Sequence, residues 1–168
     1  TPGFVGPNLA WLERGGVLAY ANIRGGNEFG EAWHEQGQKL HKQNVFDDFY
    51  AASQALIDTK WTDTKHLGIL GGSNGGLLMG ASLVQHPEQY RAVVGMVGIY
   101  DVPRHETAFA NGPYNVSEYG TVKDATQAKA TLAYSPLPNV KKGTKSPAVL
   151  LTTGPTHPPG APWPPRTF

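Results

Sequence analysis

The sequence contains no cysteine, so it can form neither a disulfide framework nor a thiolate metal site. No apolar run reaches the roughly 18 residues that a membrane-spanning helix requires. The formal net charge of +1 provides no excess of basic residues for binding a nucleic-acid backbone. The sequence therefore predicts neither a membrane nor a nucleic acid as a partner.

What the chain does contain suits a globular domain: 168 residues, of which 39% are hydrophobic and 16% charged. It begins at Thr1 with neither an initiator Met nor the pattern of a signal peptide. We therefore expect a fragment, whose compartment is either the cytoplasm or the periplasm. The lack of cysteine favours the cytoplasm.

Short apolar runs alternate with helical patterns along the chain. The runs are typical of buried strands and occupy residues 16–23, 66–72, 91–99 and 147–153. Between them, helices are expected at residues 44–59, 74–88 and 124–136. Asn44 is the expected N-cap of the first helix, and Pro87 ends the second. Alternation of this kind predicts an α/β fold with a mainly parallel sheet and crossover helices on both faces.

The octapeptide "ILGGSNGG" contains a G-x-S-x-G pattern formed by Gly71, Ser73 and Gly75. In this pattern a serine nucleophile lies on a sharp turn between a strand and a helix, where small neighbours permit close packing. The N–H of Asn74 would then face an oxyanion. One alternative is a tight turn in which Ser73 serves only as an N-cap. A phosphate-binding loop is a third, although the Lys-Ser/Thr pair of a P-loop is absent.

Four stretches together resemble the prolyl oligopeptidase family of serine peptidases. In chain order they contain "RGGNEFG", "KQNVFDDFYAASQALI", "LGILGGSNGGLL" and "AYSPLPNVKKGTKSPAVLLTTG". The resemblance implies that residues 1–154 are part of an α/β-hydrolase catalytic domain, truncated at both ends. It also implies an N-terminal β-propeller domain in the full-length protein, a short peptide as substrate, and no metal or organic cofactor.

The resemblance further implies a Ser–Asp–His triad in that chain order, with Ser73 as nucleophile and Asn74 as backbone oxyanion donor. A second donor, a tyrosine hydroxyl, is expected upstream of Thr1. Ile99 and Tyr100 are candidate walls of the substrate pocket, and Asn115 and Tyr119 are further candidate substrate-binding residues. Asn115 stands where an aromatic residue would pack on a substrate proline, four positions before Tyr119, which makes strict proline specificity an open question.

The expected triad aspartate falls on His157, within an anomalous segment at residues 155–168. This segment holds six of the fourteen prolines. Pro159 and Gly160 stand where Arg and Val are expected, and each of the three exchanges needs only one base change. We interpret the segment as a sequence error in an ordinary C-terminal stretch. The alternative is a genuine proline-rich tail.

The triad histidine is expected beyond the chain. Among the six histidines present, His105 is the nearest alternative by topology, because it follows the third apolar run. A role in the loop or at the rim of the pocket suits it better.

Charged residues elsewhere have structural interpretations. Asp47 and Asp48 fit the start of a helix, and Asp101 fits a structural or pocket-lining role. Arg24 and Glu28 are a candidate pair that orders the "RGGNE" loop, with ordinary surface pairing as the alternative.

The sequence thus predicts a serine peptidase that hydrolyses short peptides through an acyl-enzyme, with cleavage after proline as a candidate specificity. This chain alone lacks the triad acid and base, so it should be nearly inactive. An esterase or acylaminoacyl-peptidase on the same fold is one alternative. A non-catalytic interaction module is another.

Overall fold

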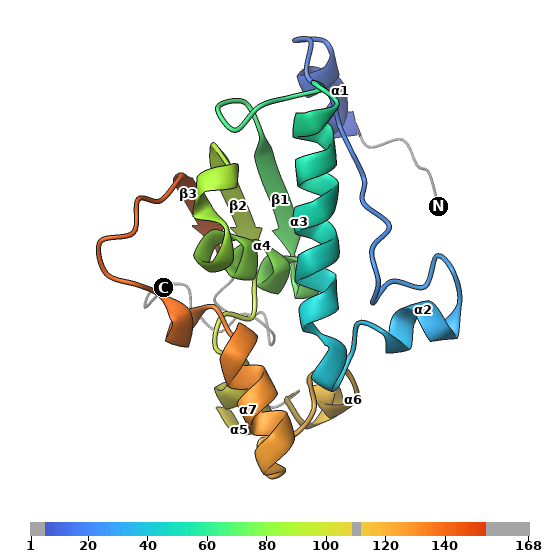
Figure 1. Ribbon diagram of the computed structural model, residues 1–168, viewed down its shortest axis with the longest axis vertical. Helices are drawn as coiled ribbons and strands as arrows, with labels where there is room; N and C mark the ends of the chain where they lie inside the picture. Colours follow the sequence, from blue (N-terminus) through green and yellow to red (C-terminus); the bar gives the residue numbers. More distant parts are fainter. Residues whose placement is uncertain (1–5, 109–111, 154–168) are drawn as a thin grey trace.

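The computed structural model describes residues 6–108 and 112–153 (Figure 1). Three strands form a parallel sheet in the order β1-β2-β3. They are β1 (Gly68–Gly72), β2 (Ala92–Met96) and β3 (Ala148–Thr152). Their register pairs Ile69 with Val93 and Val93 with Val149. The predicted parallel α/β fold is confirmed.

Helices precede and separate these strands. The α-helices are α1 (Gly6–Leu12), α2 (Glu31–Glu35), α3 (Gln43–Asp58), α4 (Asn74–Gln85), α5 (Val102–Ala108), α6 (Val116–Tyr119) and α7 (Ala125–Tyr134). Short 3-10 helices are η1 (Lys39–His41), η2 (Pro87–Gln89), η3 (Gly112–Asn115) and η4 (Leu137–Asn139). No helix among the described residues is long and apolar enough to cross a membrane.

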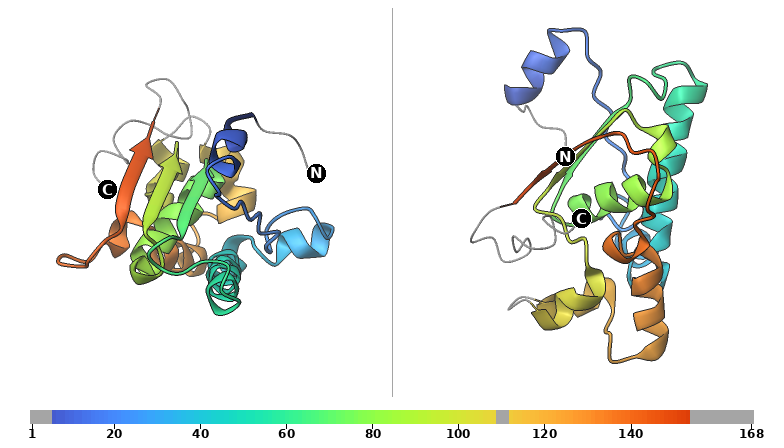
Figure 2. Two further views of the ribbon diagram at one scale, coloured as in Figure 1. Left: turned by 90° about the horizontal axis from the view of Figure 1, so that it is seen from above. Right: turned by 90° about the vertical axis from the view of Figure 1, so that its left-hand side faces the viewer.

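Figure 2 shows that α4 lies between the sheet and α3. Residues from α4, β1, β2 and α3 form much of the hydrophobic core, including Leu77, Ile69, Val93 and Phe46. In the described residues, only this face of the sheet is covered by packed helices, so the predicted helices on both faces are found on one face only. On the opposite face Leu70 and Leu150, which both align with Val94, are 66% and 57% exposed.

Three of the four predicted strands are present, and the strand expected at residues 16–23 is wrong. This segment forms no strand and no ladder with β1, and its side chains face outward, with Val17 59% and Tyr20 76% exposed. A buried strand needs a neighbour that accepts and donates its backbone hydrogen bonds. Within the described residues, none is provided here.

The predicted helices are found with small shifts at their ends. The expected N-cap Asn44 is wrong: α3 begins at Gln43, and the Asn44 side chain donates to the carbonyl of Gln36 (2.8 Å). The helix at residues 124–136 is α7. There Asp124 caps the first turn by accepting from the N–H of Gln127 (2.8 Å).

The carboxyl ends of β1 and β2 point toward α5, α6 and α7, which gather at the lower end of the molecule (Figure 1). Ser73 and Asn74 follow β1 directly, and Ile99, Tyr100 and Asp101 follow β2. The carboxyl ends of parallel strands are where α/β folds usually bind their ligands. The candidate site therefore lies at this end of the sheet.

Candidate active site

Ser73 lies on the turn between β1 and α4 with φ 56° and ψ −116°. Such a positive φ is uncommon for a residue other than glycine and persists only where the surrounding structure enforces it. The N–H of Ser73 donates to the carbonyl of Met96 (2.9 Å), and its carbonyl accepts from the N–H of Leu77 (3.1 Å). One hydrogen bond ties the turn to the end of β2, and the other starts α4.

The side chain of Ser73 is exposed and makes no capping hydrogen bond with α4. A serine that serves as an N-cap has backbone angles in the extended region and accepts a hydrogen bond from the first turn. Ser73 has neither property. The structure therefore argues against the N-cap interpretation and leaves the hydroxyl available for chemistry.

Two glycines permit the sharp turn. A Cβ at Gly71 would lie 2.4 Å from the carbonyl oxygen of Gly75, and one at Gly76 would lie 2.5 Å from the Cα of Gly98. Both obstacles are backbone atoms, which cannot swing aside as a flexible side chain can. Close packing of α4 on β1 and on the loop after β2 is thus the reason for these glycines.

The first turn of α4 provides the electrostatics of the site. The first four N–H groups of an α-helix have no partner within the helix, and the helix dipole places positive partial charge there. Asn74 begins α4 directly after Ser73. An oxyanion that forms beside Ser73 would be stabilised at this point.

The side chain of Asn74 is held by a residue far away in sequence. Its Nδ2 donates to Oε1 of Glu118 in α6 (3.0 Å), and the same oxygen accepts from Nζ of Lys42 (2.5 Å). The Lys42 side chain is only 2% exposed. Burial lowers the pKa of Lys42, and the neighbouring Glu118 opposes that shift.

The predicted pocket residues lie around the same end of the sheet. Ile99, Tyr100 and Tyr119 are 5%, 0% and 6% exposed, and Tyr100 packs against Gly80, Gly95 and Gly98. Asn115 is half-buried, and its Nδ2 donates to Nε2 of His105 (3.0 Å). The structure places these side chains, but their contact with a substrate stays a prediction.

His105 in α5 is 2% exposed, and burial lowers the pKa of its imidazole. Nowhere in residues 6–108 and 112–153 does a hydrogen bond join the Ser73 side chain to a histidine. His105 thus packs among buried side chains, where its ring also contacts that of Tyr119 edge-on. The triad-acid position His157 and the rest of residues 155–168 lie outside the described part of the chain.

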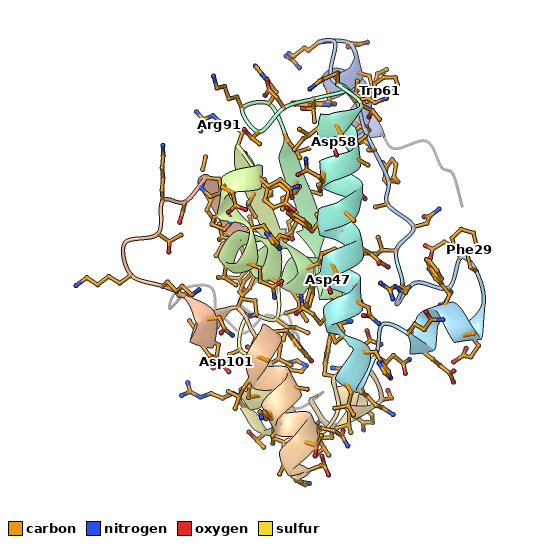
Figure 3. The ribbon with its side chains drawn as sticks, viewed as in Figure 1. Phe29, Asp47, Asp58, Trp61, Arg91 and Asp101 are labelled. Carbon is orange, nitrogen blue, oxygen red and sulfur yellow. The ribbon has the colours of Figure 1, made fainter. Side chains whose placement is uncertain are left out.

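Asp101 and Arg24 have clear partners. Asp101 is buried near α7 (Figure 3), with Nη1 of Arg104 3.5 Å from its carboxylate. The candidate pair between Arg24 and Glu28 is wrong. Arg24 instead donates to Asp48 in α3 from its backbone N–H (3.0 Å), Nε (2.8 Å) and Nη2 (2.5 Å). The first turn of α3 contains no acidic residue, so the helix-start role expected for Asp47 and Asp48 is wrong, and Asp48 instead binds the loop through Arg24.

Sequence reasoning gave no role to Lys42 or Glu118, although both lie within stretches that it examined. A lysine just before an amphipathic helix is ordinarily a solvated charge. Only the fold brings together Lys42, which lies between η1 and α3, with Asn74 of α4 and Glu118 of α6. No local pattern of residues could have indicated this cluster.

The model of the prolyl oligopeptidase family matches residues 3–158. The chain belongs to the prolyl oligopeptidase family. A prolyl endopeptidase of Elizabethkingia meningoseptica is 40% identical over 155 residues, which are 90% of this chain and 22% of that protein. An uncharacterized peptidase of Sinorhizobium fredii is 44% identical over 154 residues, or 88% of this chain and 21% of that protein.

Solved structures of this family give the same picture. A chain from a study of two prolyl endopeptidases superposes with a TM-score of 0.94 at 44% identity, covering 98% of this chain and 24% of that one. A post-proline cleaving enzyme from Rickettsia typhi gives a TM-score of 0.85 at 40% identity, covering 88% and 21%. The α/β-hydrolase assignment is confirmed, and the chain spans about a fifth of the length of its curated relatives.

Proposed function

We propose that the protein is a serine peptidase that hydrolyses short peptides through an acyl-enzyme formed on Ser73. The observation that carries this proposal is the Ser73 turn itself. An exposed hydroxyl on a strained strand-to-helix turn, with no capping role, is the arrangement of a nucleophile. Membership of a peptidase family makes a peptide bond the substrate to test first.

The chemistry assigned to this chain has two parts. Oγ of Ser73 attacks the carbonyl carbon of the peptide, and its proton passes to a histidine base that later gives it to the leaving amine. The N–H of Asn74 donates to the oxygen that becomes negative in the tetrahedral intermediate. Water then attacks the acyl-enzyme by the same route and regenerates the Ser73 hydroxyl.

The base and the acid of the triad are not among the described residues. We therefore assign activity to the full-length protein and expect residues 1–168 alone to be nearly inactive, because loss of triad members removes several orders of magnitude of rate. The greater length of the relatives supports a further domain. A β-propeller that restricts access to short peptides is the domain proposed.

Cleavage after proline is the specificity proposed. The prolyl endopeptidases among the relatives support it, and Asn115 in place of an aromatic residue argues for a tolerant pocket. The test uses the full-length protein with a short peptide that carries proline before the scissile bond and a matched peptide that carries alanine. A short-chain ester and an N-acylated peptide test the esterase and acylaminoacyl-peptidase alternatives.

We expect mass spectrometry to show cleavage after proline by the wild type and none by Ser73→Ala. Preference for the ester or for release of the acylated residue would replace the proposed specificity. A folded protein that hydrolyses none of the four substrates would instead support a non-catalytic interaction module.

A further inference from the structure

Glu118 joins the candidate active site to a buried lysine. Its Oε1 accepts from Nδ2 of Asn74 at 3.0 Å and from Nζ of Lys42 at 2.5 Å. Its other oxygen lies 3.8 Å from Nε2 of His34, too far for a hydrogen bond. One carboxylate oxygen of Glu118 is thus bound both by a buried cation and by the side chain of the residue that follows Ser73.

Lys42 makes Glu118 a rigid anchor. A buried ammonium group is costly unless a counter-ion and hydrogen bonds compensate it, so the carboxylate position is closely determined by the lysine. Lys42 itself is enclosed, with its Nζ 5.3 Å from the ring centre of Tyr119. Its backbone N–H donates to the carbonyl of Lys39, which ties it to η1 (3.1 Å).

The hydrogen bond between Glu118 and Asn74 matters for catalysis because of the position of Asn74 directly after Ser73. Its backbone N–H is the proposed oxyanion donor, and the direction of that N–H depends on the peptide between Ser73 and Asn74. Ser73 directs that peptide through its ψ of −116°, in a backbone conformation strained by its φ of 56°. A side-chain tether on Asn74 opposes relaxation of this peptide toward an ordinary helix start.

We infer that Glu118, fixed by Lys42, is a positioning residue that holds the Asn74 side chain and so directs the Asn74 N–H at the oxyanion. This inference rests on the proposed function, because it presupposes acyl transfer at Ser73. A hydrogen bond to the oxyanion strengthens only in the transition state, so its misalignment lowers kcat more than it raises KM.

The test measures kcat, KM and the rate constant of inactivation by a fluorophosphonate in the full-length enzyme. Glu118→Ala removes both contacts and should lower kcat and the inactivation rate about 10- to 100-fold, with KM changed little. Glu118→Gln retains an oxygen that can accept from Asn74 and Lys42, so it should recover most of the lost rate.

Asp48→Asn is the matched control. It weakens another ion pair, that of Arg24 and Asp48, which has no contact with Ser73 or Asn74. It should lower thermal stability without lowering kcat. A purely structural role for Glu118 predicts the same pattern for Glu118→Ala, and that result would overturn the inference.

Asn74→Ala keeps the backbone N–H and the Lys42–Glu118 pair. It therefore tests whether the Asn74 side chain positions its N–H, even if Glu118→Ala does not fold. Asn74→Ala should reproduce the loss in kcat. The double variant of Glu118→Ala and Asn74→Ala should be no slower than either single variant, because each substitution removes the same hydrogen bond between the two side chains. Unchanged kinetics of Asn74→Ala, or additive losses in the double variant, would refute positioning. If the wild type is not inactivated at all, the proposed function and this inference both fall.

Discussion

Residues 16–23 and 66–72 are both apolar but differ in structure. Both are short apolar runs next to glycines, and both predict a buried strand. The second run forms β1 in full register with β2, and its Ile69 is 6% exposed. The first forms no strand, and most of its side chains are exposed. Hydrophobicity alone therefore predicts a tendency to be buried but does not specify the neighbouring strand.

The two segments are also held by different interactions. β1 is joined to β2 by a backbone ladder, whereas the end of the 16–23 segment is held by side chains. Nε1 of Trp33 donates to the carbonyl of Ile23 (2.8 Å), and the next residue, Arg24, is bound to Asp48. Substitutions near β1 should consequently cost far more stability than substitutions near residues 16–23.

The largest expected contrast is between two leucines. Leu77 in α4 is fully buried in the core, and Leu18 is 39% exposed. Leu77→Ala should lower the free energy of unfolding by about 2–5 kcal/mol, because it removes buried methyl groups and leaves a cavity. Leu18→Ala should cost less than about 1 kcal/mol. Urea unfolding followed by tryptophan fluorescence measures the free energy of unfolding of both variants. Equal losses of stability would contradict the expected difference between the two segments.

A smaller effect is expected at two neighbouring glycines of α4. Gly76→Ala should destabilise the protein by about 1–3 kcal/mol, because its Cβ would meet the backbone of Gly98. Gly75→Ala is the matched control, since nothing lies within 4 Å of its Cβ. It should be neutral or stabilise the helix by up to about 1 kcal/mol. Equal melting temperatures for the two variants would contradict the close approach of α4 to the loop after β2.

The smallest effect concerns the Arg24–Asp48 pair, which is partly exposed. Asp48→Asn should cost no more than about 1 kcal/mol at neutral pH and should increase proteolysis near residues 16–23. The bound arginine lowers the pKa of Asp48 in the folded protein. The pair therefore contributes its full stability above the unfolded pKa of about 4 and loses it as the pH falls below that value.

Melting curves of the wild type and Asp48→Asn across this range check the sign. The difference between them should shrink as the pH is lowered below about 4. A difference that grows toward acid pH would mean that the carboxylate does not stabilise the fold through Arg24.

The residues that sequence reasoning identified correctly are those with a local signal. The turn at Gly71, Ser73 and Asn74 has such a signal, small residues at fixed spacing, and it lies between β1 and α4 as predicted. The catalytic roles of Ser73 and Asn74 stay predictions. The helix expected at residues 44–59 is present as α3 because its apolar residues repeat with the period of a helix, and Phe46 on it is buried.

What sequence reasoning missed depends on contacts between distant segments. Glu118 reaches Asn74 across 44 residues and Lys42 across 76, and Arg24 reaches Asp48 across 24. In each case a charged side chain is ordinarily solvated, and only the tertiary fold determines whether it is paired. The strand predicted at residues 16–23 failed for the same reason, because its pairing depends on residues far away in the sequence.

Labelling by a fluorophosphonate probe tests most directly whether Ser73 is a nucleophile. The full-length protein is treated with the probe, digested, and mapped by mass spectrometry, with Ser73→Ala as the control. We predict a single covalent adduct on Ser73 that is absent from the variant. A folded wild-type protein that remains unlabelled, or labelling of another serine in both the wild type and Ser73→Ala, would contradict the nucleophilic role of Ser73.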